Sequence, residues 1–227
     1  MRSIPALLML SLLTGTVVLA RPPSAATAQP AQLTFVAVST FDTDAEGWTT
    51  DGDAGCLPTP CYAATGGNPD GHIYSNDGLQ GIKYYYNAPA KFLGNVSSAY
   101  QGHLTFDMRQ DLVNRGETND NDVILEGAGL RLVYNTPRNP PSLWLTYDVP
   151  LVETAGWHKG TLRGPPPSAM EMQAVLGSLT RLGLRGDFIF GQATSYLDNV
   201  VLGGPESPPA PVTVVFEVFL PIVRTTP

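Results

Sequence analysis

Short runs in which apolar and polar residues alternate dominate this sequence and constrain its fold more than any other feature. Turn-forming clusters such as GGNPDG, SNDG and NTPRNPP separate the runs, and the 227 residues include 23 glycines and 21 prolines. Alternation with period two is typical of a strand with one buried face. Candidate strands cover residues 33–41, 82–87, 102–110, 122–135, 142–151, 181–190 and 195–202. Many short strands at this spacing predict an all-β protein, an antiparallel β-sandwich or jelly roll.

One segment, PPPSAMEMQAVLGSL, departs from the strand pattern. Ser168 is followed three residues later by Glu171, which is the spacing of a helix capping box. The apolar residues Met170, Ala174, Val175 and Leu179 recur at helical spacing. The segment therefore predicts one short helix over residues 169–179 that leads directly into the next strand.

The two ends of the chain differ in composition from the strand-rich part. Residues 1–28 combine an early arginine, a short apolar run and the cleavage pattern Ala-Thr-Ala, which is the layout of a secretory signal peptide. Cleavage after Ala20 is the alternative. The other segments are a lead with the first strand (29–40), the main domain (41–202), a linker rich in Pro and Gly (203–211) and an apolar tail too short to span a membrane (212–227). The sequence thus predicts a protein that is secreted or held at the cell surface.

Charge and cysteine content narrow the possible partners. The formal net charge is −7, and loss of residues 1–28 removes two arginines and no acid. Such an acidic chain argues against nucleic acid or an anionic membrane as a partner. Cys56 and Cys61 enclose the segment LPTP, and in an oxidising compartment they predict a small disulfide loop. The alternative, a metal or redox pair, lacks further thiols and the C-x-x-C spacing.

Several motifs, in order, resemble the laminin IV type A module, also called the laminin B domain. They are FDTDAEGW, APAKFLGNVSSAYQGHLTFDMR, DVILEGAGLRLVY, VPLVETAGWHK, EMQAVLGSLTRLGLRG and SYLDNVVL, and together they cover residues 41–202. The resemblance implies an extracellular, non-catalytic β-sandwich similar in fold to carbohydrate-binding modules. Trp48 and Trp157, each after a glycine in these motifs, are expected in the core. The cysteine-rich repeats that flank the module in animal laminins are missing here, which favours a stand-alone secreted bacterial member.

An acidic segment near the start of this region suggests calcium. Asp42, Asp44, Glu46 and Asp53 approach the spacing of an EF-hand loop, but the preceding residues predict a strand rather than a helix. A structural calcium ion in a sandwich loop is the better interpretation, with Asp42, Asp44, Glu46 and the distant Asp198 as ligands. The alternative is a solvated acidic turn.

A second group of residues suggests a face for glycan binding. By alternation, Tyr85, Asp107, Arg109, Glu126 and Trp144 point away from the core side of their strands. If these strands share a sheet, the five side chains form an aromatic platform with charged neighbours, as sugar binding requires. The alternative is that Trp144 caps the edge of the core and the charges pair across strands.

The tripeptide Arg185-Gly186-Asp187 matches the sequence that adhesion proteins present to integrins. It lies within an apolar alternation just after the predicted helix, rather than at a loop tip. Alternation places Arg185 and Asp187 together on an outward face that could join Asp107 and Arg109. We therefore expect a strand here and not an adhesion signal.

These observations favour a binding function over catalysis. No G-x-S-x-G motif and no Ser/His/Asp arrangement is recognisable, and the histidines do not have metal-ligand spacing. The sequence predicts a secreted, non-catalytic binding or adhesion module for an extracellular glycan or a matrix or surface protein. The alternatives are a purely structural matrix or envelope module and, with less support, a glycosidase-like enzyme.

Overall fold

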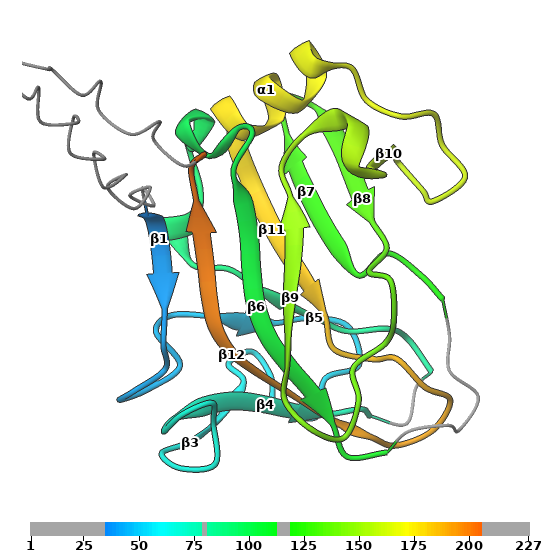
Figure 1. Ribbon diagram of the computed structural model, residues 1–227. Helices are drawn as coiled ribbons and strands as arrows, with labels where there is room; N and C mark the ends of the chain where they lie inside the picture. Colours follow the sequence, from blue (N-terminus) through cyan, green and yellow to red (C-terminus); the bar gives the residue numbers. More distant parts are fainter. Residues whose placement is uncertain (1–34, 79–80, 113–118, 206–227) are drawn as a thin grey trace, which may run out of the picture. The chain divides into compact units, whose positions relative to one another are not determined.

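The computed structural model describes residues 35–78, 81–112 and 119–205, and within them the chain folds into two antiparallel sheets with one α-helix. The predicted signal peptide, most of the linker and the apolar tail lie outside the described residues. None of the described helices is long and apolar enough to cross a membrane. The predicted antiparallel β-sandwich with one short helix is therefore confirmed (Figure 1).

Sheet A contains six strands in the order β3-β4-β12-β6-β9, with β1 also paired to β12. Its strands are β1 (Phe35–Ser39), β3 (Cys61–Ala63), β4 (His72–Asn76), β6 (His103–Gln110), β9 (Leu145–Pro150) and β12 (Thr194–Gly203). In Figure 1, β12, β6 and β9 lie in front of the other layer. The long strands β6 and β12 form the centre of this sheet.

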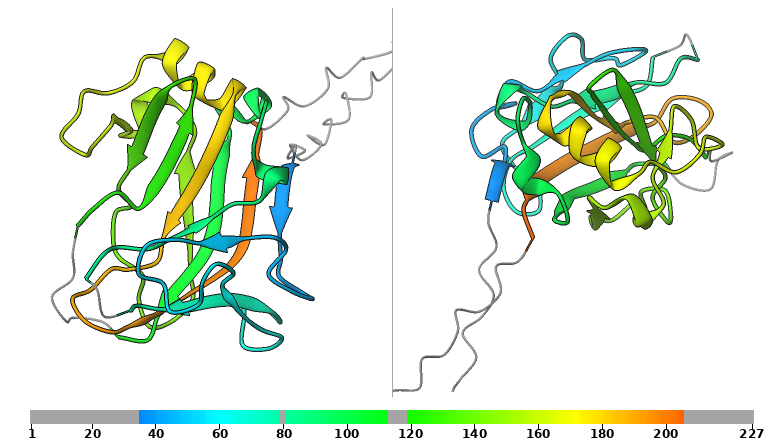
Figure 2. Two further views of the ribbon diagram at one scale, coloured as in Figure 1. Left: turned by 180° about the vertical axis from the view of Figure 1, so that it is seen from behind. Right: turned by 90° about the horizontal axis from the view of Figure 1, so that it is seen from above.

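Sheet B also contains six strands, in the order β10-β8-β7-β11-β5-β2. Its strands are β2 (Thr49–Thr50), β5 (Tyr85–Asn87), β7 (Val123–Gly127), β8 (Leu130–Tyr134), β10 (His158–Lys159) and β11 (Leu179–Arg185). Seen from behind, β11, β7 and β8 lie in front of β6 and β12 (Figure 2). The chain crosses repeatedly between the two layers, because β5 and β7 belong to sheet B whereas β6 belongs to sheet A.

The helix α1 (Ala169–Gly177) begins as the sequence predicts. The Ser168 side chain accepts the N–H of Glu171, and the Glu171 carboxylate accepts the N–H of Ser168, which completes the capping box. Met172, Val175 and Leu176 are buried, whereas Met170 is exposed. Viewed from above, α1 lies over one end of the sandwich (Figure 2). Three short 3-10 helices complete the described elements: η1 (Ala90–Phe92), η2 (Ser97–Ala99) and η3 (Glu153–Ala155).

Three predicted strands are wrong in their extent, and one of them, 82–87, is a strand only over Tyr85–Asn87. The predicted strand 122–135 is two strands, β7 and β8, joined by a hairpin turn at Ala128 and Gly129, which have φ values of 51° and 72°. Two consecutive residues with positive φ are the mark of a tight hairpin turn. The predicted strand 181–190 ends at Arg185, and Phe190 is 77% exposed.

The core between the sheets holds large aromatic side chains, including the fully buried Trp48 and Trp157, as predicted. A buried polar contact also joins the two layers. The Tyr84 hydroxyl, just before β5, donates to the carbonyl of Ser75 in β4 at 2.7 Å. The Tyr86 hydroxyl donates to the carbonyl of Ser195 in β12 at 2.8 Å. Such satisfied buried pairs fix how the two sheets lie against each other.

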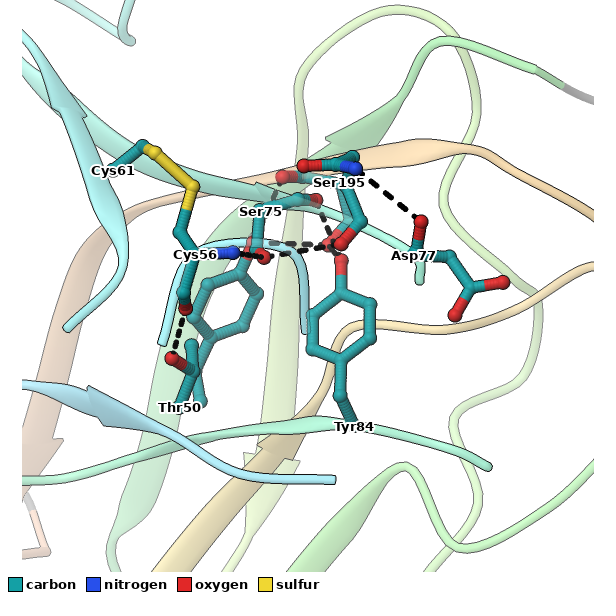
Figure 3. The surroundings of a disulfide bond; sticks show 9 residues. Thr50, Cys56, Cys61, Ser75, Asp77, Tyr84 and Ser195 are labelled. Atoms are coloured by element: carbon teal, nitrogen blue, oxygen red, sulfur yellow. Dashed lines mark hydrogen bonds between the residues drawn. A yellow bond between two sulfur atoms is a disulfide. The ribbon is translucent and has the colours of Figure 1, made fainter. Parts of the chain in front are cut away.

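The predicted disulfide is confirmed. Cys56 and Cys61 are joined, and Cys61 begins the edge strand β3 (Figure 3). The N–H of Cys56 donates to the Ser75 hydroxyl at 3.2 Å, so the disulfide loop is tied to β4. Closing such a short loop stabilises the folded state by about 2 kcal/mol through the entropy of the unfolded chain.

Candidate functional site

Four side chains form a row across the outer face of sheet A, and we call this set the cross-strand row. Tyr74 of β4 pairs with Tyr196 of β12, and Tyr196 pairs with Arg109 of β6. Trp144 lies one residue before Leu145, which pairs with the neighbour of Arg109. Three adjacent strands thus each contribute one residue, and Trp144 immediately precedes the fourth, β9; side chains at paired positions emerge on the same face.

Alternation along each strand explains why these side chains face outward. Ile73, Leu197 and Met108 belong to the core between the sheets. Each is the direct neighbour of a member of the row, and successive residues in a strand point to opposite faces. All four members are partly exposed. With strands about 4.8 Å apart, the row extends over roughly 14 Å.

The members of the row contact one another closely. The rings of Tyr74 and Tyr196 stack with centroids 5.9 Å apart. The Cζ atom of Arg109 lies 3.6 Å from the centroid of the Tyr196 ring and 5.2 Å from that of Trp144. The Trp144 indole N–H donates to the carbonyl of Gly66 at 3.1 Å. The row is therefore a rigid, accessible surface with one positive charge among three aromatic rings.

His72, two residues before Tyr74 on β4, lies on the same face and packs against the row. It is 4% exposed, and its ring lies 5.7 Å from the Trp144 ring and 5.6 Å from the Tyr196 ring, centroid to centroid. Burial lowers the pKa of His72, and the nearby charge of Arg109 lowers it further. A lowered pKa keeps the imidazole neutral at pH 7. His72 thus adds bulk and rigidity without adding charge.

Asp107 lies on the same face, two residues before Arg109 in β6, and it forms hydrogen bonds that hold a neighbouring loop. Its Oδ2 accepts the side-chain N–H groups of Asn68 at 3.0 Å and Asn199 at 2.8 Å. Its Oδ1 accepts the Thr146 hydroxyl at 2.5 Å. The N–H of Asn68 also donates to Asp198 at 2.6 Å. These contacts hold the loop of residues 65–71, which includes the Gly66 carbonyl, against sheet A.

Tyr85 and Glu126, the other two predicted glycan contacts, lie on sheet B. Tyr85 packs with Ile124 and Val133 and is nearly buried, and its hydroxyl donates to the carbonyl of Asn121 at 3.0 Å. The Glu126 carboxylate accepts a hydrogen bond from the Arg131 guanidinium at 2.9 Å. The five predicted residues therefore do not share one face: Asp107, Arg109 and Trp144 come together, and the other two do not.

Sequence reasoning missed Tyr74, Tyr196 and His72. Tyr196 falls inside a predicted strand, between the inward-facing Ser195 and Leu197, so the alternation already placed it outward. Tyr74 and His72 belong to β4, which the sequence did not predict as a strand. A search for aromatic residues at outward positions of HIYSN would have found both.

The acids of the predicted calcium segment contact groups of the protein. Oε1 of Glu46 accepts the N–H groups of Thr40 at 2.9 Å and Phe41 at 2.6 Å, and Oε2 pairs with Lys91. Asp44 accepts the N–H of Glu46 at 2.6 Å, and Asp42 accepts the Thr40 hydroxyl at 2.8 Å. In the part of the chain that the structure describes, no group of three or more His, Cys, Asp or Glu side chains could hold a metal. The segment also lies between strands β1 and β2, so it is not an EF-hand.

The tripeptide Arg185-Gly186-Asp187 does not belong to the site. Arg185 is the last residue of β11 in sheet B, is fully buried, and pairs with Asp122 at 3.2 Å. The expectation that its charges could join Asp107 and Arg109 is wrong, because β11 and β6 lie in different sheets. The expectation that it is no adhesion signal agrees with the burial of Arg185.

Comparisons with known proteins identify the family. A model of the family Laminin B (Domain IV) matches residues 85–211. Laminin subunit gamma-2 of Equus caballus is 40% identical over 125 residues, which are 52% of this chain and 10% of that protein, so the chain spans only a small part of the length of this relative.

Two solved structures superpose on part of the chain. The L4b domain of human laminin alpha-2 superposes with a TM-score of 0.47 at 14% identity, over 53% of this chain and 70% of that domain. A family 11 carbohydrate-binding module of a Clostridium thermocellum cellulosomal cellulase superposes with a TM-score of 0.49 at 14% identity, over 79% of this chain and 99% of that module. Since the family match spans more than half of the sequence, this chain belongs to the laminin B (domain IV) family.

Proposed function

We propose that this domain is an extracellular, non-catalytic binding module that holds a glycan on the cross-strand row. The observation that supports it is the row itself. Three adjacent strands and the residue before β9 present four partly exposed side chains: Tyr74, Tyr196, Arg109 and Trp144. Sugar rings stack on aromatic faces, and their hydroxyls need polar groups nearby. An extended saccharide fits a straight row better than a compact ligand does.

An extracellular location agrees with two features of the chain. The first 28 residues have the composition of a secretory signal, and Cys56 and Cys61 form a disulfide. Disulfides persist in oxidising compartments and are rare in the cytosol. A glycan outside the cell is therefore a reasonable partner.

Replacing Trp144 with alanine is expected to weaken glycan binding at least about tenfold, since loss of one stacked ring costs roughly 1.4 kcal/mol or more. Binding is measured on a glycan array and then by affinity electrophoresis with the polysaccharides that bind. Met170→Ala, which removes an exposed apolar side chain on α1, is the matched control and should bind like the wild type.

Two outcomes would contradict the proposal. If the wild-type protein binds no glycan, the row merely stiffens sheet A and the domain is a structural module. If a glycan binds with equal affinity to the wild type and to Trp144→Ala, the binding surface lies elsewhere.

We also propose that one calcium ion binds between Asp42 and Asp198, two of the four ligands that the sequence suggests. Burial raises the pKa of Asp198 to about 6, and the negative charges of Asp107 and Asp42 contribute to the increase. A cation near these carboxylates would relieve both the burial cost and the repulsion. Backbone carbonyls and water would supply the other oxygen ligands that calcium requires.

Calcium at about one hundred times its dissociation constant is expected to raise the melting temperature of EDTA-treated protein by roughly 5 °C or more. Differential scanning fluorimetry with calcium, magnesium and EDTA measures this. Asp42→Asn should lose the calcium response and retain its fold, because Asp42 is exposed. Identical melting curves of the wild type in calcium and in EDTA would exclude the site.

A further inference from the structure

Resting on the proposed glycan site, we propose that the ligand is an acidic glycan, and that the guanidinium of Arg109 binds the carboxylate of a uronic acid residue. The proposal concerns which class of saccharide the cross-strand row selects. It follows from the way Arg109 is held, from the state of its neighbours and from the distance to Trp144.

The flat face of the Arg109 guanidinium stacks on the Tyr196 ring, and its N–H groups remain available to bind a ligand. Its Cζ atom lies 3.6 Å from the Tyr196 ring centroid, and Tyr74 stacks against Tyr196. Stacking uses the flat face of the guanidinium and leaves the N–H groups pointing outward in its plane. Among the described residues, none accepts a hydrogen bond from the Arg109 side chain or forms an ion pair with it. By contrast, Arg131 and Arg181 both pair with carboxylates on sheet B.

The acids nearest to Arg109 in the sequence already accept hydrogen bonds from other groups. Asp107 accepts hydrogen bonds from Asn68, Asn199 and Thr146. Asp111 accepts the N–H of Thr194 at 2.8 Å. His72, a further titratable group packed against the row, is held neutral by its lowered pKa. Arg109 is therefore a fixed positive charge with unused donors, partly exposed on a surface made of aromatic rings.

The spacing within the row suits a sugar that carries a carboxylate. A uronic acid has its carboxylate directly on the sugar ring. A ring that lies against Trp144 can present this group to Arg109, whose Cζ atom is 5.2 Å from the indole centroid. A planar carboxylate can accept two parallel hydrogen bonds from a guanidinium, which a neutral hydroxymethyl group cannot do. The formal net charge of −7 disfavours unspecific attraction of a polyanion, so this contact must be local.

Polygalacturonate, its fully methyl-esterified form and a neutral β-glucan serve as probes for the full chain. The wild type is expected to bind polygalacturonate at least about tenfold more tightly than the methyl ester, since esterification removes the charge-assisted hydrogen bonds to the guanidinium. Arg109→Lys keeps the positive charge but loses the planar guanidinium that can donate two parallel hydrogen bonds. This variant should lose most of the preference for polygalacturonate over the methyl ester. Arg163→Lys, an exposed arginine away from the row, is the matched control and should keep it. Thermal melting shows whether each variant is folded.

The outcomes separate this inference from the proposed function. If no polysaccharide binds, both fail. If the acidic and esterified polymers bind equally while Trp144→Ala abolishes binding, the glycan site stands and the acidic preference is overturned. Dextran sulfate tests whether any polyanion binds through its charge alone. If it binds as tightly as polygalacturonate, and Arg109→Lys does not weaken its binding, the inference is also overturned. The comparison between the two polymers on wild-type protein decides the question even if Arg109→Lys does not fold.

Discussion

Replacing Asp122 with alanine is expected to lower the free energy of unfolding by about 3 to 5 kcal/mol. Asp122 is 3% exposed and pairs with the fully buried Arg185 at 3.2 Å. Oδ2 of Asp122 also accepts the backbone N–H of Thr136 at 2.8 Å and its hydroxyl at 2.6 Å. The substitution leaves a buried guanidinium without this carboxylate, and it also leaves the Thr136 N–H without its acceptor. Domains of this size are stable by only about 5 to 15 kcal/mol, so the loss is a large fraction.

Urea-induced unfolding followed by tryptophan fluorescence measures the change. Glu126→Ala is the control, because Glu126 pairs with Arg131 on the partly exposed outer face of the same sheet and should cost about 1 kcal/mol or less. The double variant Asp122→Leu/Arg185→Met should be more stable than Asp122→Ala, since an apolar pair leaves no buried charge. A loss for Asp122→Ala no larger than that of the control would show that the pair does not stabilise the fold.

The pair also shows why a short motif can mislead. The letters Arg-Gly-Asp match an adhesion signal, and alternation along a strand predicts that Arg185 faces away from the core. It does face away from the space between the sheets, but Asp122 and Phe188 enclose it on that side, with the Phe188 ring centroid 4.7 Å from Cζ. Periodicity gives the face of a strand; it does not show what covers that face.

Local sequence signals predicted much of the fold. The capping box of Ser168 and Glu171 fixed the start of α1, and the longer alternating runs became β1, β6, β9 and β12. The short strands β2, β3 and β10 have two or three residues each, so alternation cannot reveal them. They form only because a longer neighbouring strand provides hydrogen-bond partners, which is a tertiary effect.

The candidate site was only partly predictable for a related reason. Alternation correctly placed Arg109 and Trp144 on outward positions, and these two residues meet. It could not show that β5 and β7 flank β11 in sheet B, so Tyr85 and Glu126 were grouped with residues of the other layer. Sheet membership depends on the order of strands in space, and no local pattern encodes that order.

Replacing Trp48 with alanine is expected to cost about 3 to 5 kcal/mol of unfolding free energy, because a large cavity opens in the core. Trp48 is fully buried, packs edge-on against Phe41 and Phe92, and donates its indole N–H to the Ser39 hydroxyl at 2.9 Å. The acidic segment before it forms the turn that directs it inward: Glu46 and Gly47 have φ values of 47° and 78°. The Glu46 carboxylate binds the N–H groups of Thr40 and Phe41 and stabilises this turn.

Chemical denaturation measures this loss, and Trp144→Ala is the matched comparison. Trp144 is partly exposed outside the core, so its removal should cost less stability than Trp48→Ala while weakening glycan binding. Trp48→Ala should lower stability without weakening glycan binding, since Trp48 lies between the sheets and not in the cross-strand row. At low temperature, the folded fraction of this variant should bind glycan as the wild type does. If Trp48→Ala lost affinity without losing stability, the ligand would have to enter the core side of the sandwich, and the proposed surface would be wrong. Opposite effects of the two tryptophans would separate the residue that maintains the fold from the residue that binds.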